Sequence, residues 1–209
     1  PVAFFPLHRQ PERTSVPEGS EFLDYQFDLV LKARRWLPPD MELFVKEHPS
    51  QVVRGKHGEL GRSPLSYRFV NGLPKTTMIS GQSALELTLT SRDLVVAITG
   101  TLGLASAVRG VPTVYFGAPW WAGAPGTWKW NGELSFSWIM QRERGDAESV
   151  RSYLLNLLSR AAIPGFGSQS ARVFWESNIS QPEGFDEVST DAMVGTVRSF
   201  VSQYVVGKA

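Results

Sequence analysis

The sequence predicts an α/β protein with a parallel sheet covered by helices on both faces. Five short apolar segments and the helical patterns between them support this prediction. The segments are residues 2–5, 42–47, 76–79, 94–98 and 113–116. Strands buried on both faces of a parallel sheet read as continuous apolar runs, and each needs a crossover connection to the next.

The first crossover is a helix over residues 21–36. Ser20 is a favourable cap for this helix, and Phe27, Val30 and Leu31 fall on one helical face. Pro38 and Pro39 end the helix before the second strand.

Further helices are predicted over residues 64–71, 83–90 and 101–109. A later helix begins at Asp146, and the last one aligns apolar residues between 193 and 204. We therefore expect a helical C-terminal third. The expected organisation is a single domain over residues 1–209, in which residues 1–140 form the sheet core and residues 141–209 the C-terminal helices.

Composition limits the classes of function. The chain has 209 residues, of which 42% are hydrophobic and 20% charged, as in ordinary globular domains. A net charge of +1 without a run of Lys or Arg disfavours nucleic-acid binding. The absence of cysteine excludes disulfides and thiolate metal sites. No apolar run reaches the ~20 residues that span a bilayer.

The chain starts at Pro1, directly on an apolar strand. From this start we expect a domain excised from a longer protein, whose missing neighbour would hold part of the active site.

The fourth strand ends at a candidate phosphate site. Thr99-Gly100-Thr101-Leu102-Gly103 follows the strand and opens a helix. Free N–H groups and the positive end of the helix dipole favour a phosphate there. The alternative is that Gly100 and Gly103 only permit a close turn between strand and helix.

Two further polar clusters follow strands that we expect to end at the same edge of the sheet. Lys46, His48 and Pro49 follow the second strand, and Gln10 and Glu12 follow the first. Open α/β sheets bind ligands at the carboxyl ends of their strands, and imidazole can donate a hydrogen bond to a phosphate oxygen. The alternative for His48 is a purely structural histidine.

A Trp-rich loop follows the fifth strand, with four Trp in residues 120–130. These indoles could stack on a ligand, insert at a membrane interface or pack against a missing domain, and packing is favoured. Trp120 and Trp121 lie nearest the strand end, so they are the two assigned a ligand role. His8, His48 and His57 are far apart in the chain and no metal-binding motif occurs, so no metal site is expected.

Several motifs together resemble the bacterial capsule polysaccharide biosynthesis family, which includes Kdo transferases of capsule and lipopolysaccharide assembly. The motifs are Phe4-Phe5-Pro6-Leu7-His8-Arg9-Gln10-Pro11-Glu12, Val45-Lys46-Glu47-His48-Pro49, Thr99-Gly100-Thr101-Leu102-Gly103, Gly110-Val111-Pro112, Phe116-Gly117-Ala118-Pro119-Trp120-Trp121 and Pro125-Gly126. They appear in the family's order and cover roughly residues 1–130. As a set they are more specific than any one motif.

The resemblance implies a metal-independent GT-B glycosyltransferase, of which this chain would be the C-terminal, Rossmann-like, nucleotide-sugar-binding domain. The donor would be a CMP-activated 2-keto sugar acid such as CMP-Kdo, with no cofactor beyond it. The acceptor would be a glycan or glycolipid at the cytoplasmic face of the bacterial inner membrane. The N-terminal GT-B domain would complete the enzyme.

The resemblance also implies roles for particular residues. His48 with Pro49 and residues 99–101 would hold the CMP phosphate, assisted by Lys46. The turn containing Ser80, Gln82 and Ser83 would line the base or ribose. Of the two residues after the first strand, Gln10 would help orient the sugar and Glu12, like His48, would serve catalysis.

One position departs from the family pattern. Relatives usually carry a Glu in the helix after the Gly-Thr turn, where this chain has Ala105. The acidic contact to the donor is therefore missing or supplied elsewhere. Two alternatives stay open: a transferase that uses CMP-sialic acid or a CDP-polyol, and a non-catalytic scaffold module.

Overall fold

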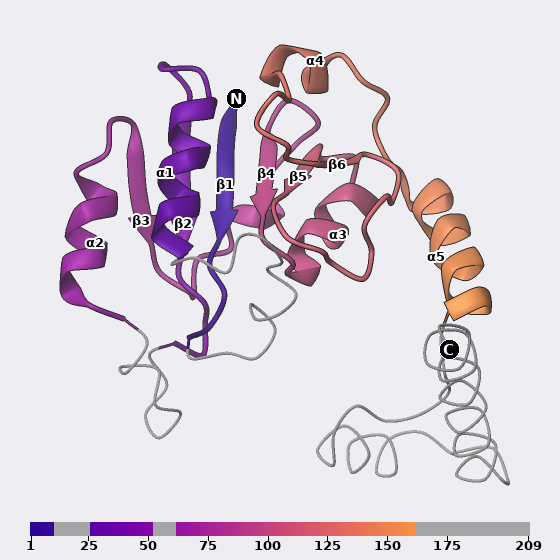
Figure 1. Cartoon of the computed structure of the whole chain (residues 1–209), viewed down its shortest axis with the longest axis horizontal. Coiled ribbons are helices and arrows are strands. Elements are labelled where there is room, and N and C mark those ends of the chain that lie inside the picture. The colour runs from indigo at the N-terminus through magenta and orange to yellow at the C-terminus, as the bar shows by residue number, and fades with distance from the viewer. Residues whose placement is uncertain (11–25, 52–61, 162–209) are drawn as a thin grey trace, which may run out of the picture. The chain divides into compact units, whose positions relative to one another are not determined.

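The computed structural model describes residues 1–10, 26–51 and 62–161, which contain a six-stranded parallel sheet (Figure 1). The strands are β1 (Val2–Pro6), β2 (Glu42–Lys46), β3 (Thr76–Ile79), β4 (Leu94–Ala97), β5 (Thr113–Tyr115) and β6 (Thr127–Lys129). Their order across the sheet is β3-β2-β1-β4-β5-β6, and all neighbours are parallel. This strand order is that of a doubly wound, Rossmann-like fold, which confirms the expected fold class.

Helices cover both faces of the sheet. They are α1 (Gln26–Trp36), α2 (Pro64–Asn71), the 3₁₀ helix η3 (Leu85–Leu87), α3 (Thr101–Val108), α4 (Phe136–Met140) and α5 (Ala147–Ala161). Apolar side chains of α1, α2 and α4 pack on one face, and those of η3, α3 and α5 belong to the clusters on the other.

The central strand β1 shows how the apolar runs divide between the two faces. Phe5 packs in the cluster with α1, whereas its neighbour Phe4 packs in the cluster with η3, and both side chains are fully buried. Successive side chains of a strand point to opposite faces, so a strand covered on both sides must be apolar at consecutive positions.

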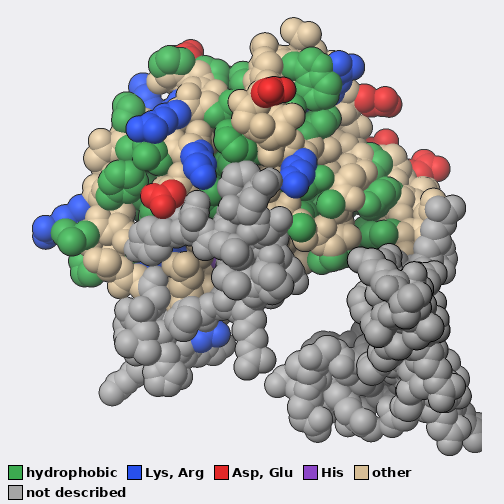
Figure 2. Space-filling model, in the orientation of Figure 1, with side chains coloured by type: hydrophobic (Ala, Val, Ile, Leu, Met, Phe, Trp, Pro, Cys, Tyr) green, Lys and Arg blue, Asp and Glu red, His purple; other side chains and the backbone are tan. Residues whose placement is uncertain are grey.

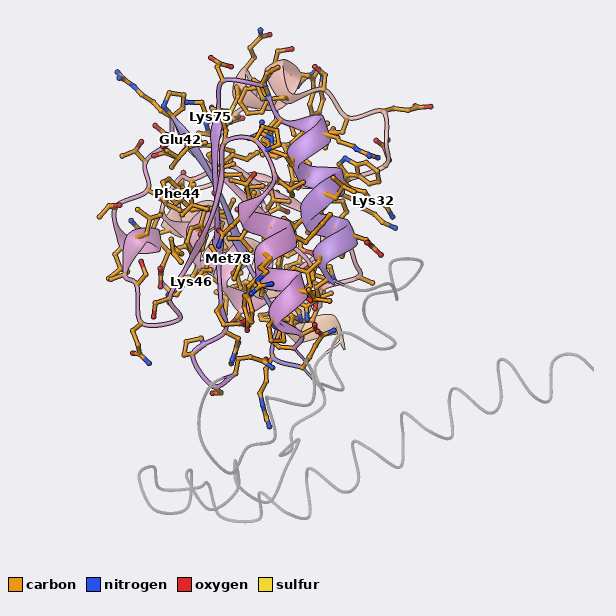
Figure 3. The ribbon with its side chains drawn as sticks, turned by 90° about the vertical axis from the view of Figure 1, so that its left-hand side faces the viewer. Lys32, Glu42, Phe44, Lys46, Lys75 and Met78 are labelled. Carbon is orange, nitrogen blue, oxygen red and sulfur yellow. The ribbon has the colours of Figure 1, made fainter. Side chains whose placement is uncertain are left out.

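The strand order reverses next to β1, which pairs with β2 on one side and with β4 on the other. The carboxyl ends of these three strands lie at one edge. Figure 3 shows this polarity for β2, with Glu42 at one end, Phe44 between and Lys46 at the other. Such a reversal is a topological switch point, where the loops diverge and leave a crevice.

Three local expectations differ from the structure. The helix expected over residues 83–90 is reduced to the single turn Leu85–Leu87, because Thr88 Oγ1 donates back to Leu85 O and Thr90 forms a separate turn with Asp93. Thr127–Lys129, expected in a loop, forms the edge strand β6 against β5. Helix α4 has no counterpart among the predictions.

Other expectations lie outside the described residues, namely residues 21–25 of the first helix, Glu12, and the helix between 193 and 204. Residues 1–155 group as one compact unit and residues 156–209 as another, of which the structure describes only residues 156–161. The expected single domain and the helical C-terminal third beyond α5 therefore remain predictions. No helix in the described ranges has the length and apolar character needed to cross a membrane.

Charges are mixed over the described surface. On the face in Figure 2, basic and acidic side chains are scattered among hydrophobic ones, in agreement with the net charge of +1. An anionic ligand would therefore be attracted by local groups rather than by a field of the whole molecule.

Candidate functional site

A cavity of about 530 Å³ lies at the carboxyl edge of the sheet, at the switch point between β1 and β4. Its lining comes from the carboxyl ends of β1, β2 and β4, from the start of α3, from η3 and from the loop after β5. The residues are Pro6, Leu7, His8, Lys46, Glu47, His48, Pro49, Glu86, Thr99, Gly100, Thr101, Leu102 and Trp120. Ligands of open α/β sheets bind in this crevice.

The wall after β4 is formed by Thr99, Gly100, Thr101 and Leu102. Gly100 is the N-cap of α3, with φ −61° and ψ 144°, and no side chain caps the helix. The first N–H groups of a helix have no acceptor within the helix and carry the positive end of its dipole. Thr101 and Leu102, the first two helical residues, line the cavity.

His8 lies against this wall. Thr99 N donates to His8 Nε2 at 3.4 Å, and a Cβ added at Gly100 would lie 3.2 Å from the same nitrogen. Gly100 therefore allows the imidazole to approach the backbone closely. Because Nε2 accepts, neutral His8 carries its proton on Nδ1.

The wall after β2 presents a second imidazole. His48 lines the cavity, and its Nδ1 accepts a hydrogen bond from Ser50 N at 3.1 Å. An accepting Nδ1 places the proton of neutral His48 on Nε2. The turn thus selects the tautomer in which Nε2 is the donor.

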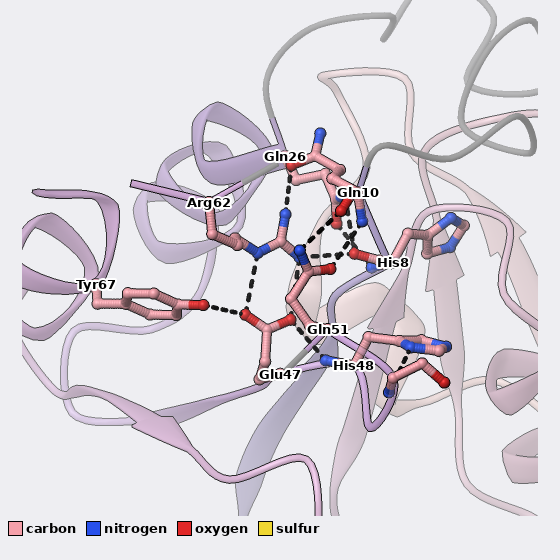
Figure 4. Close-up of polar contacts among 9 residues, drawn as sticks. His8, Gln10, Gln26, Glu47, His48, Gln51, Arg62 and Tyr67 are labelled. Carbon is pink, nitrogen blue, oxygen red and sulfur yellow. Dashed lines mark hydrogen bonds and ion pairs between the residues drawn. The ribbon is translucent and has the colours of Figure 1, made fainter. Parts of the chain in front are cut away.

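Glu47 anchors the turn that carries His48 (Figure 4). Arg62 binds it in a bidentate pair, Nε to Oε2 and Nη2 to Oε1, both at 3.0 Å. Tyr67 Oη donates to Oε2 at 2.7 Å, and His48 N donates to Oε1 at 2.7 Å. The side chains of Arg62 and Glu47 are only 3% and 8% exposed, so this is a buried, fully bonded carboxylate.

The same network holds the chain after β1. Arg62 also donates to His8 O at 2.6 Å and to the side-chain oxygen of Gln10. Gln26 accepts from His8 N at 2.7 Å and donates to His8 O at 3.1 Å. Gln51 bonds Gln10 N and Gln10 O in the same way, both at 2.8 Å. Both imidazole-bearing segments are therefore tied to one guanidinium.

Tyr67 is protonated in this network over the ordinary pH range. Burial, followed by the hydrogen bond to Glu47 and the charge of that carboxylate, raises the pKa of Tyr67 to about 12. The neutral phenol keeps donating to Glu47 at any pH near 7.

A second charged pair lies in the cavity lining. The Lys46 ammonium contacts Glu86 Oε1, and these side chains are 8% and 19% exposed. Lys46 ends β2, while Glu86 comes from η3. The charge of Lys46 is therefore largely balanced by Glu86.

The cavity lining includes seven of the residues that the sequence assigned to the site: Lys46, His48, Pro49, Thr99, Gly100, Thr101 and Trp120. Gln10 lies in the network behind the lining. The turn with Ser80, Gln82 and Ser83 is outside the lining but packs against the His48 turn. A Cβ at Gly81 would lie 2.9 Å from both Glu47 O and Pro49 Cα.

Gly103 and Trp121 lie in the core rather than at the cavity. Trp121 is fully buried and packs edge-on against Tyr115, with ring centroids 5.3 Å apart. A Cβ at Gly103 would lie 2.8 Å from Trp121 Cη2, so the absence of a side chain at this position allows α3 to pack directly against the indole. A buried indole has no surface to stack on a ligand, which corrects the ligand role expected for Trp121. Trp120 is 52% exposed and does line the cavity.

The sequence missed several residues of the site. His8 and His48 lie far apart in the chain, yet both line the cavity. Glu86, Arg62 and Tyr67 carried no signal, because their roles depend on partners far away in the chain. Within residues 1–10, 26–51 and 62–161, no cluster of three or more His, Cys, Asp or Glu is arranged to hold a metal ion.

The comparisons with known proteins give a family match and a weak structural likeness. A solved structure, Thermosulfurimonas dismutans KpsC, described as a beta Kdo 2,7 transferase, aligns with 75% of this chain at 18% identity and a TM-score of 0.45. The alignment covers 54% of that chain, so this chain spans about half the length of that structure. So weak a likeness does not identify an activity. A search of curated proteins found no match.

Residues 14–166 match the profile of the family described as capsule polysaccharide biosynthesis protein. This match covers well over half of the sequence. The chain therefore belongs to the capsule polysaccharide biosynthesis family.

Proposed function

We propose that this chain is the donor-binding domain of a GT-B glycosyltransferase that acts in bacterial capsule or lipopolysaccharide synthesis. The proposed donor is a CMP-linked 2-keto sugar acid, CMP-Kdo in the first instance. The observation that carries the proposal is the cavity at the switch point, where His48 and the N-terminus of α3 line one space in a chain of the capsule family.

The chemistry of the lining suits the phosphate of CMP. The first N–H groups of α3 and the Nε2 proton of His48 are donors, and a phosphate presents only acceptors. Lys46 is balanced by Glu86, so phosphate recognition falls to these donors rather than to a lysine point charge.

The same groups would assist transfer. When the bond between the sugar and the phosphate oxygen breaks, its electron pair stays on the phosphate, and the acceptor oxygen forms the new bond to the sugar. Donors fixed in advance around the phosphate stabilise this growing charge without a metal ion. The acceptor hydroxyl loses its proton to a base, which we assign to the second domain of the GT-B enzyme. We place the enzyme in the bacterial cytoplasm, at the inner face of the membrane where its acceptor is assembled.

Calorimetric titration with CMP tests the proposal, and titrations with UMP and GMP are the controls for nucleotide selectivity. We expect selective CMP binding. Replacing His48 with Ala removes a hydrogen bond to a charged group and lowers CMP affinity about tenfold or more. Glu133→Ala, at an exposed position outside the lining, is the control and keeps wild-type affinity.

If wild-type protein binds no cytidine nucleotide, the donor-binding proposal is wrong. This outcome favours the scaffold alternative, for which the specific feature is Ala105, an exposed residue of α3 at the position where the family resemblance leads us to expect Glu. If CMP binds, turnover of CMP-Kdo, CMP-sialic acid and CDP-glycerol by the full-length enzyme distinguishes the possible donors.

A further inference from the structure

Trp138, on the short helix α4, is a large apolar residue that stays exposed. It is 40% exposed, although its neighbour Ile139 is fully buried and Phe136 packs against the same core cluster. Trp128 of β6 lies edge-on to it, with ring centroids 6.4 Å apart and an angle of 79° between the ring planes. Neither indole lines the cavity.

A guanidinium lies on this exposed indole. Cζ of Arg142 is 4.1 Å from the centroid of the Trp138 ring. No carboxylate of the described residues pairs with Arg142. Arginine can stack on an aromatic ring and still offer the N–H groups in its own plane to a carboxylate. Trp138 and Arg142 therefore present an apolar ring beside an unpaired cation.

Hydrogen bonds hold the helix that carries this pair. Arg144 donates to Ile139 O at 2.9 Å and to Met140 O at 2.8 Å, so it caps the last turn of α4. Before the helix, Trp36 Nε1 donates to Leu134 O. A ligand would therefore meet a surface arranged in advance, which reduces the entropy lost on binding.

The pair lies at the edge of the sheet opposite the cavity. Helix α1 ends at Trp36, before β2 begins at Glu42, so Trp36 is near the amino ends of the strands. Phe136 of α4 packs edge-on against Trp36, with ring centroids 6.2 Å apart. Figure 1 shows α4 at the top, where β1 begins, while the strand arrows point down. A second domain that completes the active site faces the carboxyl edge, so contact with it does not explain the exposed Trp138.

The two side chains suit a sugar ring that carries a carboxylate. One face of a pyranose consists of C–H groups, which pack on an indole. A carboxylate accepts two parallel hydrogen bonds from a guanidinium. Because the chain belongs to a polysaccharide biosynthesis family, an acidic glycan is a ligand of this chemistry that the protein would meet.

A single-stranded nucleic acid also offers flat rings and negative charge, but it fits the chain less well. Its binding sites combine stacking residues with a positively charged groove along the backbone. The chain has a net charge of +1 without a run of Lys or Arg. One arginine beside an indole matches a carboxylate on a sugar better than a row of phosphates.

We infer that Trp138 and Arg142 form a second binding site, for an acidic glycan, at the amino edge of the sheet. Trp138 packs on a sugar ring, Arg142 binds its carboxylate, and Trp128 holds the orientation of Trp138. The site holds the polysaccharide on the protein and takes no part in the transfer step. It does not depend on which nucleotide the cavity binds.

Calorimetric titration of the whole chain with acidic trisaccharides tests this site. The probes are trisaccharides of sialic acid and of galacturonic acid, each compared with its carboxyl-reduced form. Wild type should bind an acidic probe about tenfold more tightly than the reduced form, since the carboxylate adds a charge-assisted hydrogen bond. Arg142→Gln should remove this preference. Trp138→Ala should weaken both forms about fivefold, and Trp138→Tyr should keep most of the affinity because an aromatic ring remains.

The controls separate this site from the cavity and from a loss of folding. Circular dichroism and cooperative unfolding first show that each variant folds. Arg68→Gln and Leu65→Ala, at exposed positions of α2, should keep wild-type affinity for the trisaccharides. Saturation with CMP should also leave this affinity unchanged, because the cavity lies at the other edge of the sheet.

Three outcomes would overturn the glycan site. The first is that wild type binds neither acidic probe, and the second is that Trp138→Ala and Arg142→Gln bind both forms as wild type does. The third is competition between CMP and the trisaccharide, which would place the glycan in the cavity. Binding of a single-stranded oligonucleotide in place of both trisaccharides belongs to the first outcome and would assign the surface to nucleic acid. None of these results affects the donor proposal, which is tested by CMP binding alone.

Discussion

The two walls of the cavity are built in different ways. On the β2 side, the buried pair of Glu47 and Arg62 bonds His48 N, Tyr67 Oη and His8 O, and this network holds the turn that carries His48. On the β4 side the wall consists of Thr99 to Leu102, at the end of β4 and the start of α3, placed by the packing of α3 on Trp121. The first wall depends on the identity of several polar residues, whereas the second depends on how closely a helix approaches the sheet.

This difference predicts different responses to substitution. Removing a charge from the β2 wall leaves another charge buried, so the fold itself should suffer. The β4 wall should tolerate a change of side chain at its surface but not an added carbon beneath the helix or a missing backbone N–H.

Replacing Arg62 with Met should lower the free energy of unfolding by about 3–5 kcal/mol, because it leaves the Glu47 carboxylate buried without its cation. Urea unfolding measures the loss. Arg68→Met, at an exposed position of α2, should change stability by less than about 0.5 kcal/mol. A loss below about 1 kcal/mol for Arg62→Met would mean that the β2 wall does not depend on this pair.

Replacing Gly103 with Ala should destabilise the protein by about 1–3 kcal/mol, since the new Cβ would lie 2.8 Å from Trp121 Cη2. Thermal unfolding measures the effect. Adding Trp121→Phe should restore part of the loss by making room. Ala105→Ser, on the exposed side of the same helix, is the control. Equal stability of Gly103→Ala and wild type would show that α3 can move away from the sheet freely.

Replacing Thr101 with Pro tests the backbone N–H of the β4 wall. Proline is favourable at the first position of a helix, and Gly100 already has an extended conformation that a following proline accepts. CMP affinity should fall about tenfold while stability is retained. Thr101→Ala removes the hydroxyl but keeps the N–H, so its loss of affinity should be clearly smaller. Equal losses of CMP affinity in the two variants would mean that the Thr101 hydroxyl, rather than its backbone N–H, binds the phosphate.

Replacing Tyr67 with Phe should reduce stability by about 1 kcal/mol at neutral pH, because Arg62 still binds Glu47. The folded pKa of about 12 lies above the ordinary pKa of a free tyrosine, about 10. The stabilisation is therefore complete below pH 10 and is lost as the pH rises toward 12. Urea unfolding at pH 8 and pH 11 should show the difference between the two proteins shrinking. A difference that stays constant would contradict this assignment.

The sheet could largely be predicted from the sequence because its strands are apolar at consecutive positions. Val95, Val96 and Ala97 are all fully buried, so burial on both faces was readable without knowledge of the partner strands. Strand β6 could not be predicted from the sequence, because it is three residues long and its pairing with β5 depends on the path of the loop between them. The prediction of a helix over residues 83–90 was wrong because the side chains of Ser83 and Thr88 form local hydrogen bonds with the backbone in place of helical ones.

The site could be predicted only where it follows a strand end. The placement of His48 and of Thr99 to Thr101 at one cavity could be predicted, because parallel strands bring their carboxyl ends to one edge of the sheet. Arg62 and Tyr67 were not, because nothing local marks a partner of Glu47 that lies 15 or 20 residues further along the chain. The adjacent tryptophans looked alike in the sequence, but packing against Gly103 buries Trp121 and leaves Trp120 at the cavity.

The pairing of β1 has a consequence for assays. β1 pairs with β2 along its whole length and with β4 at Ala3 and Phe4, so the two halves of the sheet meet between β1 and β4. The cavity lies across this junction, and a ligand bound there fastens one half to the other. At a hundredfold excess over its dissociation constant, such a ligand raises the free energy of unfolding by about 2.7 kcal/mol. A melting-temperature screen can therefore rank candidate nucleotides without an acceptor, a second domain or any turnover.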